Sequence, residues 1–267
     1  MISTNILLGA IAMVTLFLGV PIARWRRASE RSRGMLALVS AGVLLFLIIE
    51  VGYRAMGAVE VSARAGEMGH ATQLGLIFFI GLSMGLIGLS WLEEWRDKRR
   101  ESGTNPLELA TVIAVGIGLY NFAEGLAFGH LFVASGTVRL GTLLVIGLAL
   151  HNATEGLSIA GPLVGLDVSW ARLLSLGMIG GGPTVIGAVL GIWVSPLIEL
   201  FFLSMATGSL IYVTRELFRI RLKSLGAVAA MTAVAVGVFI GFGTELVAQL
   251  GQARATMHTT GSKSADF

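Results

Sequence analysis

The sequence predicts an all-α polytopic membrane protein with eight transmembrane helices. Hydrophobic residues make up 55% of the 267 residues and charged residues only 13%, whereas soluble domains average about 25% charged residues. Apolar runs of about 20 residues, the length that a helix needs to cross the hydrocarbon, recur along the chain. These runs span residues 4–23, 35–57, 72–93, 107–131, 138–161, 170–192, 195–217 and 224–250.

We expect residues 1–250 to form a single transmembrane domain and residues 251–267 to form a disordered C-terminal tail, because the tail is polar and lacks an apolar run. The chain contains no cysteine, which excludes disulfides and thiolate metal sites. The formal net charge of +3 is small, and most basic residues lie between the apolar runs. This distribution predicts a lipid bilayer as partner and no nucleic acid.

The basic residues also predict the topology. Thirteen of the 19 lysines and arginines follow runs one, three, five and seven. Positively charged loops stay in the cytoplasm, so we expect a multi-pass protein of the cell (inner or plasma) membrane with both termini outside. The thirteen residues are Arg24, Arg26, Arg27, Arg31, Arg33, Arg96, Lys98, Arg99, Arg100, Arg172, Arg219, Arg221 and Lys223.

Two similar polar phrases interrupt the fourth and fifth apolar runs. The first reads Y-N-F-A-E-G at residues 120–125, and the second reads H-N-A-T-E-G at residues 151–156. Each phrase places a glutamate, Glu124 or Glu155, inside a membrane-length run. A charged side chain at mid-bilayer costs at least about 2.5–3.5 kcal/mol, so such a residue usually faces a partner, a cavity or an ion.

The side chains of these phrases form a plausible ligand set for a divalent metal. Glu124 and Glu155 offer carboxylate oxygens, and His151 offers an imidazole nitrogen four residues before Glu155, on the same helical face. Asn121 and Asn152 offer amide oxygens, although asparagines also bridge helices in membranes. This mixture suits Zn²⁺, Fe²⁺, Mn²⁺ and Cd²⁺ better than Cu⁺. The glycine after each glutamate is interpreted as a residue of close packing.

The two helices that carry these phrases are consecutive, so we expect them to run antiparallel. Similar motifs on antiparallel neighbours can face each other across a pseudo-two-fold axis in the membrane plane, which is a common transporter design. On helix six, the glycines that end at Pro183 predict either a break or static packing.

The two phrases resemble the ZIP (Zrt/Irt-like) family of divalent-metal transporters, whose members carry H-N-x-x-E-G on helix 4 and a related motif on helix 5. Residues 40–45, 180–184 and 206–212 are also similar to family stretches on helices 2, 6 and 7. The resemblance covers nearly the whole chain and implies a ZIP-like fold with inverted-repeat character. It also implies a metal site between helices 4 and 5, movement of zinc or a related cation toward the cytoplasm, and assembly as a homodimer.

The chain departs from the family pattern at two positions near the site. Tyr120 stands where the first motif has histidine, so it may line the path without binding the ion. Gly182 stands where some members add a bridging glutamate. Both departures favour one metal ion over two. Two other residues are candidates for the transport path: Glu50, which alternatively pairs with Arg54, and Glu216, which alternatively forms an interfacial ion pair.

The sequence analysis therefore predicts a transporter of divalent transition metals, with zinc first among them, and not an enzyme. The metal is the transported substrate, and we expect no resident cofactor. A degenerate member that binds or senses metal without transporting it is a second reading, favoured by Tyr120 and Gly182. An intramembrane metal-dependent hydrolase is a third reading, but the chain lacks an H-E-x-x-H motif.

Overall fold

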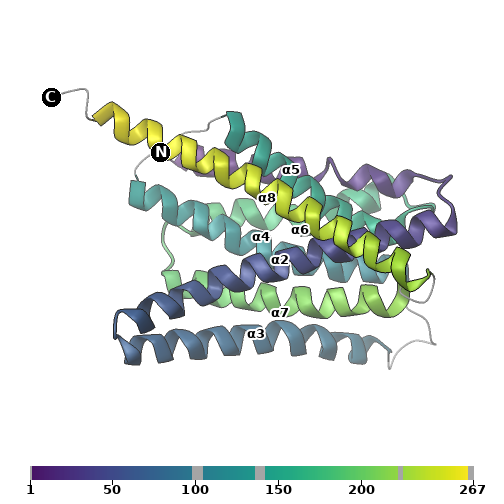
Figure 1. Cartoon of the computed structure of the whole chain (residues 1–267), viewed down its shortest axis with the longest axis horizontal. Coiled ribbons are helices and arrows are strands. Elements are labelled where there is room, and N and C mark those ends of the chain that lie inside the picture. The colour runs from purple at the N-terminus through teal and green to yellow at the C-terminus, as the bar shows by residue number, and fades with distance from the viewer. Residues whose placement is uncertain (1, 98–104, 136–141, 222–224, 264–267) are drawn as a thin grey trace.

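The protein is an all-helical bundle in the computed structural model, which describes residues 2–97, 105–135, 142–221 and 225–263 (Figure 1). No strand occurs within these ranges. Two short 3₁₀ helices, η1 (Val20–Arg24) and η2 (Gly161–Leu163), lie in the connections. The α-helices are α1 (Ile2–Leu16), α2 (Glu30–Arg64), α3 (Met68–Asp97), α4 (Pro106–Ser135), α5 (Thr142–Ala160), α6 (Trp170–Leu190), α7 (Pro196–Arg221) and α8 (Ala227–Lys263).

Seven of these helices are long and apolar enough to cross a membrane, which confirms the multi-pass membrane class for the described part of the chain. The seven do not include α5, which has 19 residues. The orientation of the protein in the membrane stays a prediction. Several basic residues on which that prediction depends (Lys98, Arg99, Arg100, Arg139 and Lys223) lie outside the described residues.

The two ends of the chain differ from the sequence expectation. The first helix stops at Leu16, and a turn leads into η1, where Pro21 lies near the start of a new helical turn. At the other end, α8 continues to Lys263, where the sequence indicated a disordered tail from residue 251. Residues 251–257 contain no proline and include alanine, glutamine, arginine and methionine, which sustain a helix once it has been nucleated. Residues 264–267 lie outside the described residues.

The fourth helix forms the centre of the bundle. Within its most apolar part, 72% of the residues are buried, compared with 22% in α3 and in α8. α4 packs chiefly against α6 and α7, whereas α5 packs chiefly against α8 and α1. Figure 1 shows that α1 begins and α8 ends at the same end of the bundle. The helices that carry the two polar phrases therefore belong to different sets of neighbours.

The sixth helix continues without a break from Trp170 to Leu190, so the break that the glycine-proline sequence suggested is not observed. Pro183 lies inside the helix, where it cannot donate a backbone hydrogen bond to the carbonyl of Ile179. That carbonyl faces Gly118 of α4, where an added Cβ would lie only 2.4 Å from its oxygen. The glycine lets α4 cover the helix at the position where its internal hydrogen bonding is interrupted.

Glycines also set the distance between α2 and α8. A Cβ added at Gly42 would lie 2.1 Å from the carbonyl oxygen of Val234, and one added at Gly237 would lie 2.0 Å from that of Val39. Real Cβ atoms do not approach backbone oxygens this closely, so the two helices touch through backbone at these positions. This contact holds α8 against α2, and both helices carry an acidic residue toward the centre of the molecule.

We predict that Gly237→Ala lowers the stability of the protein by about 1–3 kcal/mol, because the new methyl group forces α8 away from α2. Thermal unfolding in detergent would measure the change. Gly243→Ala on the same helix is the matched control, since a Cβ there meets nothing within 4 Å. Equal midpoints for the two variants would contradict the close packing of α2 and α8.

Candidate metal centre

The two polar phrases face each other across α4 and α5. The hydroxyl of Tyr120 lies 3.3 Å from Nε2 of His151. Next to Tyr120 in the first phrase, Asn121 donates a hydrogen bond of 2.7 Å from its Nδ2 to Oε2 of Glu155, the glutamate of the second phrase. The structure thus brings the two copies of the motif together as a single cluster of polar side chains.

The glycine after each motif glutamate fixes the position of its helix. A Cβ at Gly125 would lie 2.3 Å from the carbonyl oxygen of Thr184 on α6, and one at Gly156 would lie 2.0 Å from that of Leu16 on α1. Both glycines therefore permit close backbone packing, as the sequence analysis interpreted them. Because α4 and α5 are each held against a neighbour one residue from a glutamate, the two carboxylates have little freedom to move away.

All five predicted ligands are buried. Asn121, Asn152 and Glu155 are 0% exposed, His151 is 3% exposed and Glu124 is 8% exposed. Glu124 is near enough to His151 and Glu155 for their charges to act on it, but the acidic and histidine side chains whose ligand atoms lie within 4.8 Å of one another, among the described residues, are Glu50, His151 and Glu245. Burying such groups is costly unless each is hydrogen-bonded or paired with an opposite charge.

Each of these five residues nevertheless keeps a buried polar atom without a hydrogen-bond partner. The atoms are Oδ1 of Asn121, Oε2 of Glu124, Nδ1 of His151, Oδ1 of Asn152 and Oε1 of Glu155. Buried polar atoms are almost always hydrogen-bonded in folded proteins, so five exceptions in one cluster require an explanation. All five atom types are ligands of divalent transition metals, and the set matches the nitrogen and oxygen donors that zinc accepts.

The contacts that the asparagines do make hold their amide groups in place. Nδ2 of Asn121 also donates to the backbone carbonyl of Gly180 on α6, at 3.0 Å. Nδ2 of Asn152 donates to the carbonyl of Leu148 on its own helix, at 2.8 Å. In each case the amide nitrogen is used and the oxygen is left free. Asn121 therefore bridges helices, which was the alternative role for an asparagine, and its amide oxygen still has no hydrogen-bond partner.

Tyr120 contacts a predicted ligand and adds no charge to the site. Its side chain is 1% exposed, and its hydroxyl lies on the same side of the His151 ring as Glu155. Nε2 of His151 lies 3.3 Å from Oε1 of Glu155, which is close enough for an ion pair. Oε1 of Glu155 nevertheless has no hydrogen-bond partner. Tyr120 can therefore orient the imidazole, and its role in lining a transport path stays a prediction.

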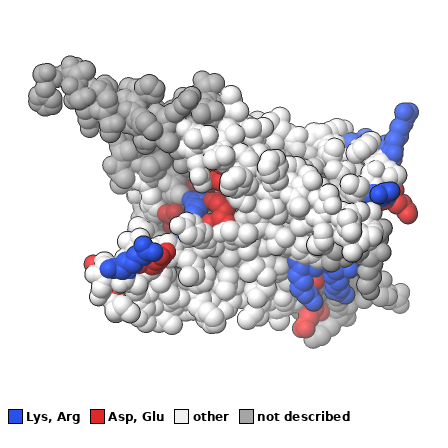
Figure 2. Space-filling model, in the orientation of Figure 1, with Lys and Arg blue, Asp and Glu red and all other residues white. Residues whose placement is uncertain are grey.

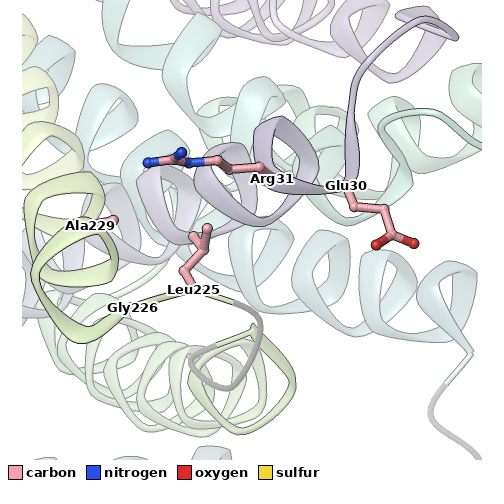
Figure 3. Close-up of a pocket in the computed structure, with 5 residues that line it drawn as sticks. All are labelled: Glu30, Arg31, Leu225, Gly226 and Ala229. Carbon is pink, nitrogen blue, oxygen red and sulfur yellow. The ribbon is translucent and has the colours of Figure 1, made fainter.

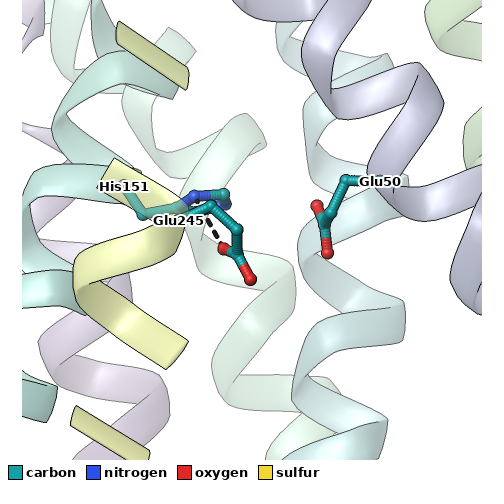
Figure 4. A group of neighbouring side chains, drawn as sticks. All are labelled: Glu50, His151 and Glu245. Atoms are coloured by element: carbon teal, nitrogen blue, oxygen red, sulfur yellow. Dashed lines mark ion pairs between the residues drawn. The ribbon is translucent and has the colours of Figure 1, made fainter. Parts of the chain in front are cut away.

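A second group of acidic residues lies on the other side of the His151 ring. Nδ1 of His151 is 3.4 Å from Oε2 of Glu245 on α8, and Glu50 on α2 lies opposite them (Figure 4). One ligand atom from each of the three residues lies within 4.8 Å of the others. The sequence analysis did not identify Glu245 as a candidate ligand. Its position inside an apolar run was the signal that could have identified it.

The cluster contains more acidic than basic side chains. Glu50, Glu124, Glu155 and Glu245 contribute four carboxylates, whereas the basic groups beside them are His151 and Arg54. Nη1 of Arg54 pairs with Oε1 of Glu50 at 3.3 Å. Figure 2 shows a small group of acidic and basic side chains in the otherwise uncharged face between the two ends of the molecule. A bound cation would pair with these carboxyl groups.

The other two path candidates lie away from this cluster. Glu216 is buried near the end of α7, where it pairs with Arg215 and with Arg219, so the ion-pair alternative is observed. Gly182 faces the side chain of Met178, with its methyl group 3.7 Å from an added Cβ. The structure therefore gives Gly182 no contact with the predicted ligands. On the same helix, Thr184 is buried, and its hydroxyl has no hydrogen-bond partner.

A pocket opens far from the cluster, between the starts of α2 and α8 (Figure 3). It is lined by Glu30, Arg31, Leu225, Gly226 and Ala229. Glu30 precedes Glu50 on α2 by a helical distance of about 30 Å, so this pocket is not part of the candidate metal centre.

Comparison with known proteins gives no relative from which a function could be transferred: no family model matches the chain, and no curated protein matches it. The candidate site therefore rests on the geometry of its own residues.

We predict that Glu124→Gln raises the thermal midpoint of the metal-free protein, because it removes an uncompensated buried charge. Saturating zinc should stabilise the wild type, by about 2.7 kcal/mol at a zinc concentration 100 times the dissociation constant, and the variant much less. Unfolding in detergent with and without zinc measures both effects. Glu67→Gln, at an exposed residue, is the control; an equal zinc response in the wild type and Glu124→Gln would contradict a metal role for Glu124.

Proposed function

We propose that this protein transports divalent transition-metal cations across a membrane, with zinc as the first candidate. The observation that carries the proposal is that Asn121, Glu124, Asn152 and Glu155 each keep a buried oxygen without a hydrogen-bond partner, in the interior of a helical membrane protein. A static structural role would be expected to pair these atoms. A site that binds and releases a cation has to leave them free in the unloaded state.

The proposed ion site consists of Asn121, Glu124, His151, Asn152 and Glu155. Two carboxylates offset the charge of a divalent cation, and the neutral imidazole and amides replace part of its water shell. A mixed set of this kind binds less tightly than a thiolate site, which suits release on the far side of the membrane. The site also lies between helices with different main neighbours, since α4 packs chiefly on α6 and α7, and α5 chiefly on α8 and α1.

We further propose that the chain is a member of the ZIP family, with a ZIP-like fold and both termini outside the cell membrane. The support is the pair of phrases at residues 120–125 and 151–156, together with their meeting across α4 and α5. In this orientation the family resemblance implies movement of the ion toward the cytoplasm, and a homodimer is the assembly that it implies.

A metal-binding protein that does not transport is the second candidate. Tyr120 takes the place of a histidine ligand and occupies Nε2 of His151, and Asn121 occupies one oxygen of Glu155. These contacts reduce the number of free donor atoms on the α4 side. Metal binding without flux would distinguish this reading from transport.

We predict that the protein reconstituted into liposomes carries zinc, and that Glu124→Ala and Glu155→Ala each abolish the flux. Both changes remove a carboxylate that would offset the charge of the ion. A zinc-sensitive dye inside the liposomes measures the flux, and competition with Fe²⁺, Mn²⁺ and Cd²⁺ ranks the metals.

Glu67→Ala is the matched control, because it removes an exposed carboxylate and should leave the flux unchanged. If the wild type binds zinc but moves none of the four metals, the non-transporting reading replaces the proposed function. If it neither binds nor moves them, the site itself is contradicted.

A further inference from the structure

We propose that Glu50, His151 and Glu245 form a second divalent-cation site, termed the α2–α5–α8 site, on the opposite side of His151 from Glu155. It would take a borderline cation of the zinc class through two carboxylates and one imidazole. The proposal shares His151 with the transport site described above, but it does not require that transport occurs.

The geometry of the three residues approaches that of a zinc site. In a tetrahedral site with bonds of about 2.0–2.2 Å, neighbouring ligand atoms lie about 3.3–3.6 Å apart. Nδ1 of His151 and Oε2 of Glu245 are separated by 3.4 Å. A ligand atom of Glu50 lies within 4.8 Å of a ligand atom from each of the other two. A small movement of the Glu50 side chain would complete three protein ligands and leave a fourth position for water.

The atoms that face this position have no other partner. Nδ1 of His151 and Oε2 of Glu50 are both buried without a hydrogen bond, and His151 is only 3% exposed. The side chain of Glu245 is 18% exposed, so it is less enclosed than that of His151. In Figure 4, His151 and Glu245 lie together, and the carboxylate of Glu50 stands opposite them on α2. Three different helices thus direct ligands to one point.

Arg54 is the basic residue that pairs with Glu50 at this site. Its guanidinium holds Oε1 of Glu50 at 3.3 Å, while the second oxygen of that carboxylate stays free. An arriving metal ion must share Glu50 with a fixed positive charge, so Arg54 weakens binding and favours release. This arrangement makes the α2–α5–α8 site a place of transient binding.

His151 connects this site with the predicted ligands of α4 and α5. Its Nδ1 faces Glu245, and its Nε2 faces Glu155 and the hydroxyl of Tyr120. A neutral imidazole has one nitrogen free to accept a metal at a time. His151 can therefore hold an ion toward Glu245 or toward Glu155, but not both at once.

The test is zinc titration of the full chain in detergent, with the double variant Glu124→Gln/Glu155→Gln as background. This background removes both carboxylates of the proposed transport site and leaves the second site intact. We expect it to bind one zinc ion, and we expect addition of Glu245→Gln to weaken that binding by at least about tenfold, since even the loss of an outer-shell partner costs about 10–100-fold. Adding Glu67→Gln instead should change nothing.

A third variant changes the affinity in the opposite direction, which misfolding cannot imitate. Arg54→Gln, added to the same background, should tighten zinc binding, because Glu50 is then no longer paired with Arg54. Weaker or unchanged binding would overturn the role of Arg54. No zinc binding by the double variant, or binding that ignores Glu245→Gln, would overturn the site.

The outcomes separate this proposal from the proposed function. If the wild type transports zinc and the double variant binds none, transport stands and the α2–α5–α8 site does not. If the wild type moves no metal and the double variant binds zinc through Glu245, the second site stands and the transport function fails.

Discussion

Acidic side chains are concentrated in the interior of the bundle, and the packing of the helices has to accommodate them. Glu155, Glu245 and Glu50 lie around His151, and Arg54 pairs with Glu50. An uncompensated buried charge costs several kcal/mol, and water is scarce inside a membrane. Protons could neutralise the carboxylates, but they would not explain why asparagine oxygens and a histidine nitrogen are also left unpaired. The proposed metal cation would give the carboxylate and asparagine oxygens a common partner.

Close helix packing keeps this costly cluster in place. Gly125 and Gly156 follow the two motif glutamates and bring α4 against α6 and α5 against α1. The contact of Gly42 with Gly237 does the same for α2 and α8, which carry Glu50 and Glu245. Backbone contact of this kind leaves no room for a carboxylate to move away from its neighbours. The many glycines of the sequence thus serve the site through the spacing of the helices.

Much of the local structure could be predicted from the sequence, because it depends on short-range patterns. Apolar runs predicted the helices, and the repeated phrase predicted Glu124, His151 and Glu155 as neighbours. The position of Glu245 on α8 beside His151 could not be predicted in this way, because α8 meets α5 only through tertiary packing. The meeting of Glu245 with His151 consequently became visible only in the folded structure.

Two further differences follow from the limits of local reasoning. The glycines before Pro183 left a break in α6 and static packing as alternatives, and the structure has a continuous helix in which α4 covers the interrupted hydrogen bond. Gly182 was placed on the transport path by resemblance, whereas the buried face of α6 carries Gly180 and Thr184. The face that a helix presents depends on its partners, and a single sequence does not contain that information.

Locating the metal itself tests the central claim most directly. Crystals of the zinc-loaded protein, measured at the zinc absorption edge, would give an anomalous difference map that places every bound ion. The account predicts a peak inside the bundle, within bonding distance of His151 and of at least one carboxylate among Glu124, Glu155, Glu50 and Glu245. A map with peaks only on the surface, at exposed residues such as His70, would contradict it.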